Sequence, residues 1–217
     1  MKAIKIQWYL IKPDILPVFY LIILSAIITL TNNSMILSSL ISATLIAVKL
    51  VPLPFEVDSD EKLDIFYNVI PISHSDFIKS RYVFLSSFGV IGILITIVLK
   101  IIILGLWKNI FFNPNEIIVS MITGLFFYML VISLQLPLYY KYGKLKARII
   151  SMIPILIFVS IFAIYSYTTI LNWLLKLISI FNDNLKLILV FMFLFSIFIE
   201  YISFNLSKSI IIRKGDK

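Results

Sequence analysis

Long apolar stretches separated by short polar ones run through most of the chain. The stretches cover residues 15–31, 35–53, 82–106, 116–138, 149–171 and 185–206. A bilayer core of about 30 Å takes about 20 helical residues, so each stretch is long enough to cross a membrane. The stretches do not alternate in polarity as the strands of a membrane β-barrel would. The pattern predicts a single-domain, all-α integral membrane protein with six transmembrane helices.

The composition supports this class. Of the 217 residues, 61% are apolar and 14% are charged, whereas soluble domains average about 45–50% and about 25%. A soluble domain needs a polar surface, so these values argue against a soluble enzyme, a nucleic-acid-binding protein and a disordered chain. The chain has no cysteine and a single histidine, His74, which excludes disulfides, thiolate metal sites and sites built from several histidines.

The distribution of positive charge predicts the orientation. Six crossings place both termini on the same side, and all but four of the 19 Lys and Arg residues lie on that side. The four exceptions are Lys100, Lys108, Lys176 and Lys186. Positive charge accumulates on the cytoplasmic side, so we expect cytoplasmic termini. Abundant Ile and an excess of Lys over Arg are typical of AT-rich bacterial genomes, which predicts a bacterial cytoplasmic membrane.

Residues 1–12 have the pattern of a helix lying in the membrane interface. Met1, Ile4, Trp8 and Ile11 share one helical face, and three lysines in the same segment can reach lipid phosphates. The alternative is an ordinary positively charged segment leading into the first span.

The longest segment predicted to be cytoplasmic, residues 52–80, contains a candidate amphipathic helix over residues 58–71. Its acidic residues come first, at the positive end of the helix, and Pro71 ends it. The apolar face is formed by Leu63, Phe66, Tyr67 and Ile70. Anionic lipid headgroups would repel the acidic residues, which favours a protein partner over the alternatives of the bilayer surface or the protein's own bundle.

A second helix is predicted to begin directly after this segment. Ser73 is followed three residues later by Asp76, which is the spacing of a helix N-cap with an acidic partner. From there the helix would continue through Arg81 and Tyr82 into the third span.

Charged groups within the spans are candidate functional residues. Lys49 and Lys100 lie near span ends, where long side chains reach the interface. Glu200 lies deeper, and we expect it to face the bundle or a hydrated cavity, near Lys49. The sequence leaves open whether a Lys49–Glu200 pair is structural or acts in transport.

Small residues recur along the second span. Five of them follow helical spacing, namely Ser38, Ser39, Ser42, Ala43 and Ala47. Small side chains allow close helix approach in membranes. Packing within one subunit and packing between subunits both fit this pattern.

Several short motifs resemble those of bacterial ABC-2 type permeases. The acidic pair Asp60-Glu61, the stretch from Ile70 to Ser73 and the pair Arg81-Tyr82 are similar to the family's loop between spans two and three. The family has arginine after the serine, whereas this chain has His74. The segment Tyr201–Lys208 resembles the family's closing pattern of two serines and a basic residue.

The resemblance implies that the chain is a transport subunit, not an enzyme, within an ATP-driven exporter. Two permeases, identical or related, would pair, and each would hold a cytosolic ABC ATPase against a coupling helix. The implied ATPase contacts are Asp60, Glu61, Leu63, Asp64, Phe66, Tyr67, Ile70 and Pro71. ATP and magnesium would bind the partner ATPase, with no cofactor on this chain, which has no G-x-x-x-x-G-K-[ST] motif.

Among small members of the family, the chain is most similar to permeases that export peptides, such as phenol-soluble modulins. This similarity implies an amphipathic or cationic peptide, or another membrane-active compound, as cargo. Membrane lipids are the other expected partners, and nucleic acid is not. Two alternatives remain open: an ion-gradient-driven secondary transporter, and a non-transport membrane anchor or lipid enzyme.

Overall fold

The computed structural model describes residues 6–9, 12, 15–29, 34–57, 73–108, 113–152 and 185–215. Within these ranges the chain is helical and contains no strand. The elements, in chain order, are α2 (Ile15–Thr29), α3 (Met35–Leu50), α4 (Leu53–Val57), α6 (His74–Lys108), α7 (Pro114–Ser151) and α10 (Leu185–Gly215). The predicted all-α class is confirmed.

Four helical segments are long and apolar enough to cross a membrane. They are Met35–Phe55, Ser75–Leu106, Pro114–Gly143 and Leu187–Arg213. The apolar part of α2, Leu16–Ile27, is shorter, and almost all of the predicted fifth span, 149–171, lies outside the described residues. The structure therefore supports a multi-pass membrane protein, while six spans and cytoplasmic termini stay predictions.

Local sequence explains where two of the long helices begin. The hydroxyl of Ser34 accepts a hydrogen bond from the backbone N–H of Leu37 at 3.4 Å, which caps α3. At the start of α7, Asn113 precedes Pro114, and its side-chain oxygen accepts from the backbone N–H of Asn115 at 3.1 Å. Proline suits the first helical position because the N–H that it lacks would have no helical acceptor there.

Two helices extend beyond the apolar stretches that predicted them. α6 begins at His74, ahead of the apolar stretch that starts at residue 82, as the predicted Ser73 cap indicated. In α7 the helix continues past residue 138 to a kink at Gly143, and a second helical stretch follows the kink as far as Ser151. Gly143 has a φ of 73° and a ψ of 179°, which interrupt the helix. Glycine is suited to this position because side chains disfavour positive φ.

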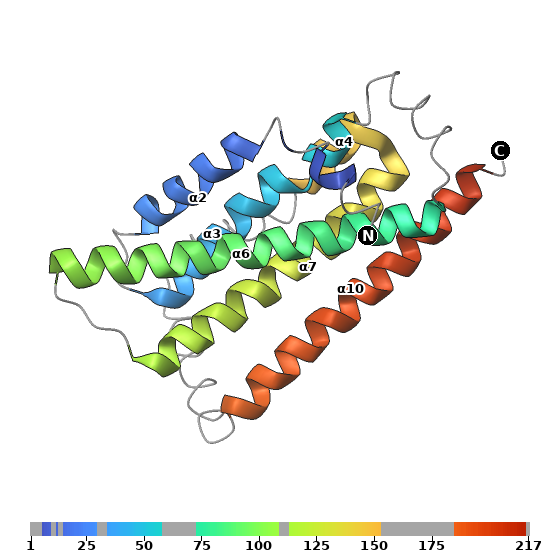
Figure 1. Cartoon of the computed structure of the whole chain (residues 1–217). Helices are drawn as coiled ribbons and strands as arrows, with labels where there is room; N and C mark the ends of the chain where they lie inside the picture. The colour runs from blue at the N-terminus through green and yellow to red at the C-terminus, as the bar shows by residue number, and fades with distance from the viewer. Residues whose placement is uncertain are drawn as a thin grey trace.

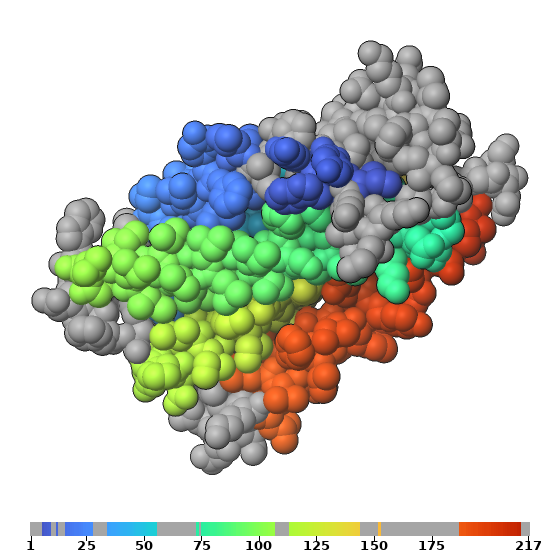
Figure 2. All heavy atoms as spheres, viewed as in Figure 1, coloured from blue at the N-terminus to red at the C-terminus, as the bar shows by residue number. Residues whose placement is uncertain are grey.

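The described helices form one elongated bundle (Figure 1). α3 packs against α2, α6 and α7, and α10 packs along α7 and to a lesser extent along α6. α4, the N-terminal end of α6 and the C-terminal end of α10 lie together at one end, which we call the α4 end (Figure 1). The space-filling view shows α10 beside α6 and α7 (Figure 2).

The small residues of α3 pack within this one chain. Ser38, Ser39, Ser42, Ala43 and Ala47 are all buried. A β-carbon added at Gly124 of α7 would lie 2.8 Å from the Cβ of Ser39, so the two helices approach closely at this point. The sequence left open whether these residues pack within one subunit or between subunits. The structure shows packing within one chain.

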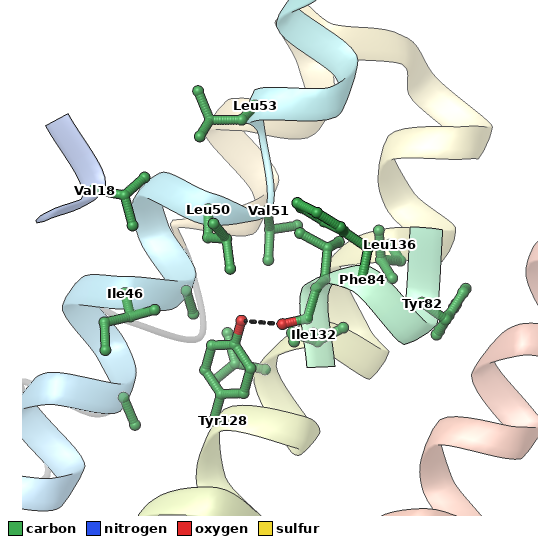
Figure 3. Close-up of a cluster of buried hydrophobic side chains, with 14 of the residues drawn as sticks. Val18, Ile46, Leu50, Val51, Leu53, Tyr82, Phe84, Tyr128, Ile132 and Leu136 are labelled. Atoms are coloured by element: carbon green, nitrogen blue, oxygen red, sulfur yellow. Dashed lines mark hydrogen bonds between the residues drawn. The ribbon is translucent and has the colours of Figure 1, made fainter. Parts of the chain in front are cut away.

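A buried tyrosine makes a second close contact, between α6 and α7. Tyr128 is fully buried, and its hydroxyl donates to the backbone carbonyl of Leu85 at 2.9 Å (Figure 3). Gly89 lies one helical turn after Leu85, and a β-carbon there would lie 1.8 Å from Cε1 of Tyr128. The missing side chain at Gly89 therefore makes room for the tyrosine ring.

Lys100 differs from its expected position at the membrane interface. Its side chain is 0% exposed, and Nζ donates to the backbone carbonyl of Ser34 at 2.9 Å and to the hydroxyl of Ser38. The expectation that this side chain reaches outward is wrong, because the polar start of α3 offers oxygen acceptors inside the bundle.

Part of the predicted interfacial helix is described. Residues 6–9 are helical, and the ring of Trp8 lies 5.7 Å from that of Phe88 in α6, centroid to centroid. These residues lie over the middle of α6 (Figure 2). The other residues that carried this prediction, Met1, Ile4 and Ile11, are outside the described residues.

We predict that Gly89→Ala destabilises the fold. The added methyl overlaps the ring of Tyr128, and an overpacked site of this kind costs about 1–3 kcal/mol. Thermal unfolding in detergent measures the effect as a lower Tm. Gly105→Ala is the matched control on the same helix, because a β-carbon there has nothing within 4 Å. Equal Tm values for the two variants would contradict this account of the contact.

Candidate functional site at the junction of α4, α6, α7 and α10

The predicted partner-binding segment lies between two described helices. Residues 58–72 connect α4, which ends at Val57, to the start of α6. The predicted contact residues, Asp60, Glu61, Leu63, Asp64, Phe66, Tyr67, Ile70 and Pro71, all lie outside the described residues. The structure nevertheless shows how both flanks of this segment are attached to the bundle.

The flank on the α6 side is capped as its sequence predicts. The hydroxyl of Ser73 accepts from the backbone N–H of Asp76 at 3.1 Å and donates to its carboxylate at 2.7 Å. The N-cap prediction is confirmed. The cap fixes the start of α6 directly after residues 58–72.

Arg81, two turns further along α6, is held by aromatic rings. Its side chain is 1% exposed, and its guanidinium carbon lies 4.5 Å from the ring centroid of Phe55, 4.7 Å from that of Phe77 and 5.7 Å from that of Tyr140. These four residues, with Tyr139, form what we call the Arg81 cluster. A desolvated cation–π contact contributes about 2 kcal/mol, so the cluster joins α4, α6 and α7 firmly.

Phe55 extends the cluster from α4 to α7. Its ring stacks on Tyr139 with centroids 4.8 Å apart and meets Tyr140 edge-on at 5.1 Å. Phe55 comes from the helix before residues 58–72, and Arg81 comes from the helix after them. Both flanks of the segment therefore contact the same place on α7.

The neighbouring residue, Tyr82, joins α6 to α10. Its hydroxyl lies 2.6 Å from the hydroxyl of Ser203 and 2.8 Å from that of Ser207, and it points toward α10 (Figure 3). Ser203 donates to the backbone carbonyl of Ser133 in α7 at 2.6 Å. We call Ser207, Tyr82, Ser203 and the Ser133 carbonyl the hydroxyl chain.

The direction of every bond in the hydroxyl chain follows from proton counting. Each hydroxyl has one proton, and Ser203 uses its proton on a carbonyl, which cannot donate. Ser203 therefore accepts from Tyr82, and Tyr82 in turn accepts from Ser207. The chain runs in one direction and ends on the backbone of α7.

Pro137 explains why the chain ends there. In a helix, the carbonyl of residue 133 would accept from the backbone N–H of residue 137, but proline has no N–H. The Ser133 carbonyl is left without its helical donor, and Ser203 of α10 supplies one from outside the helix. A missing hydrogen bond in one helix thus creates the contact with another.

Glu200 faces the bundle, as the sequence suggested, but next to α6. It accepts a hydrogen bond from the hydroxyl of Ser86. Lys49, in the last turn of α3, forms no ion pair with Glu200 in the described part of the chain. The structure does not join the two predicted partners, because Ser86 provides the polar contact for this carboxylate.

The sequence pointed to some of these residues without indicating their contacts. Arg81, Tyr82, Ser203 and Ser207 lie in the motifs that resemble a permease family, but no spacing in the sequence places Phe55 beside them. Pro137 offered a usable signal, because an internal proline always removes the donor for the carbonyl four residues earlier.

The junction connects helices through cation–π, aromatic and hydroxyl contacts. Among the described residues, no three His, Cys, Asp or Glu side chains lie close enough to hold a metal ion. What the junction provides is a set of contacts from four helices within a few turns of residues 58–72.

We predict that Ser203→Ala destabilises the protein by about 1–3 kcal/mol, the cost of leaving a buried carbonyl without a donor. Pro137→Ala restores the missing N–H, so Ser203→Ala should cost much less in that background. Thermal unfolding of the four chains measures this coupling. Ser196→Ala is the control, because Ser196 is also buried in α10 but donates to Phe193 of its own helix. Equal costs of Ser203→Ala in both backgrounds would refute the explanation.

Comparison with known protein families identifies the chain. The family model described as ABC-2 family transporter protein matches residues 2–212. Comparison with curated proteins and with solved structures gave no match. The family match extends over nearly the whole chain, including the junction and both flanks of residues 58–72. The protein is therefore a multi-pass membrane protein that belongs to the ABC-2 family of transporter proteins.

Proposed function

We propose that the chain is the permease subunit of an ATP-driven exporter, and that residues 58–71 are the docking helix for a cytosolic ABC ATPase. The observation that carries the proposal is the family match over residues 2–212. An ABC-2 permease is a transport subunit, and this chain contains no nucleotide-binding motif. ATP and magnesium then bind a separate ATPase chain.

The position of the segment between its flanks supports this assignment. Phe55 before it and Arg81 after it meet on α7 at the α4 end of the bundle. A force that residues 58–72 pass to their two flanks would reach α4, α6 and α7 together. The acidic residues and the apolar face formed by Leu63, Phe66, Tyr67 and Ile70 suit a protein surface better than anionic lipid.

The same proposal includes the orientation and the assembly. The α4 end faces the cytoplasm of a bacterial cell, where the excess of Lys and Arg places it. Two permeases, identical or related, pair to enclose a path, and each holds one ATPase. The cargo is an amphipathic or cationic peptide, or another membrane-active compound, in line with the resemblance to peptide exporters.

We predict that the double variant Phe66→Ala/Tyr67→Ala lowers recovery of the co-purifying ATPase at least about tenfold, which corresponds to about 1.4 kcal/mol of binding free energy. The apolar anchors of the helix would be lost while membrane insertion is unchanged. Affinity purification in mild detergent, with quantification of both chains, measures the ratio. Asn68→Ala is the control, because Asn68 is off the apolar face. Wild-type recovery with the double variant would show that this segment is not the docking helix.

We also predict that cargo stimulates ATP hydrolysis by the complex. In proteoliposomes, a cationic amphipathic peptide should raise the hydrolysis rate, whereas an anionic peptide of the same length and hydrophobicity should leave it unchanged. Phosphate release measures the rate. Transport of the peptide that persists without ATP and requires an ion gradient would instead favour a secondary transporter.

A further inference from the structure

Two adjacent residues of α6 are linked to α7 on opposite sides of Pro137, one directly and one through α10. Arg81 lies against Tyr140, three residues after the proline. Tyr82 reaches the carbonyl of Ser133, four residues before it, through Ser203. Residues 133 and 140 lie about 10 Å apart along a helix axis, at 1.5 Å per residue. The start of α6 is therefore linked to α7 on both sides of Pro137, directly through Arg81 and by way of α10 through Tyr82.

Pro137 is a weak point of the continuous helix that precedes the kink at Gly143, for two reasons. Its missing N–H removes one hydrogen bond from the helix, and helices bend most readily where a proline interrupts the ladder. The freed carbonyl is bonded by a side chain from another helix, and a contact of that kind can be exchanged without breaking the backbone ladder further.

The chain order connects these contacts to residues 58–72. Arg81 lies eight residues after Ser73, the cap of α6. Phe55, on the other flank, contacts Arg81, Tyr139 and Tyr140. Both flanks contact the part of α7 that follows Pro137, so a displacement of either flank acts on that part.

We propose that Arg81 and Tyr82 form a linkage that converts displacement of the N-terminal end of α6 into bending of α7 at Pro137. Arg81 moves the part of α7 after the proline through Tyr140, while Tyr82 holds the part before it through Ser203. Arg81 and Tyr82 are positioning residues in this linkage. The ATP dependence of the motion rests on the proposed function, whereas the linkage itself does not.

The competing explanation is a fixed tie, in which the same contacts only hold the helices together. The two explanations differ in what moves. A fixed tie keeps both parts of α7 at constant distances from the rest of the bundle. A linkage moves the part after Pro137 and leaves the part before it in place.

Distances between spin labels distinguish the two. The chain has no cysteine, so label pairs can be introduced without background labelling. One pair joins Leu24→Cys in α2 to Lys141→Cys, after Pro137. The second joins Leu24→Cys to Asn115→Cys, before Pro137. All three positions are exposed. Distances are measured on the full chain alone, and on its complex with the co-purifying ATPase, without nucleotide and after trapping with ADP and vanadate.

The linkage predicts that vanadate trapping shifts the 24–141 distance and leaves the 24–115 distance unchanged. Tyr82→Phe, which keeps the ring and removes the hydroxyl, and Arg81→Met should reduce the shift while the ATPase stays bound. Pro137→Ala should abolish it, and this change favours the helix, so misfolding would not account for the loss. Ser87→Ala is the control on α6, because Ser87 is exposed and donates only to Val83 of its own helix.

Other results overturn the linkage. An absent shift in the wild-type complex, an equal shift of both pairs, or a wild-type shift in Tyr82→Phe and Pro137→Ala each contradicts it. If no ATPase co-purifies with the wild-type chain, the proposed function fails. The linkage is then tested by the distances measured on the chain alone. In that case Pro137→Ala, which removes the bend, should narrow the 24–141 distribution and leave the 24–115 width unchanged, and an unchanged 24–141 width would refute the linkage.

Discussion

A backbone carbonyl inside a bilayer has no water to bind, so a gap in one helix must be filled by a neighbouring element. Pro137 makes such a gap in α7, and the hydroxyl of Ser203 fills it from α10. Tyr82 of α6 then donates to Ser203, and Ser207 donates to Tyr82. The packing of α6, α7 and α10 thus depends on the N–H that Pro137 lacks. The hydroxyl chain reaches the Ser133 carbonyl only when these three helices pack side by side.

The lipid environment also explains why the helices approach one another closely. In lipid there is little hydrophobic drive for helices to associate, so small side chains and interhelical hydrogen bonds hold them together. Gly124 lies against Ser39, and Gly89 leaves space for Tyr128 to reach the Leu85 carbonyl. Polar side chains that look misplaced in an apolar sequence are therefore the ones that position the helices.

The junction at the α4 end joins four helices through the Arg81 cluster and the hydroxyl chain. The Arg81 cluster brings the helix before residues 58–72 and the helix after them onto one site on α7. The very next residue of α6, Tyr82, belongs to the hydroxyl chain. In the function that we propose for this ABC-2 family chain, these contacts carry a motion at the membrane surface into the spans.

The amino-acid sequence by itself determined the helical class, four of the long apolar helices, the Ser73 cap and the family motifs. These follow from composition and from local spacing, which need only neighbouring residues. It also suggested that Glu200 faces the bundle. It did not reveal that Lys100 points inward to Ser34 and Ser38, or that Ser86 rather than Lys49 contacts Glu200. Only the tertiary structure decided these, because each depends on which side chain a distant helix presents at that depth, and sequence spacing within one helix carries no information about its neighbours.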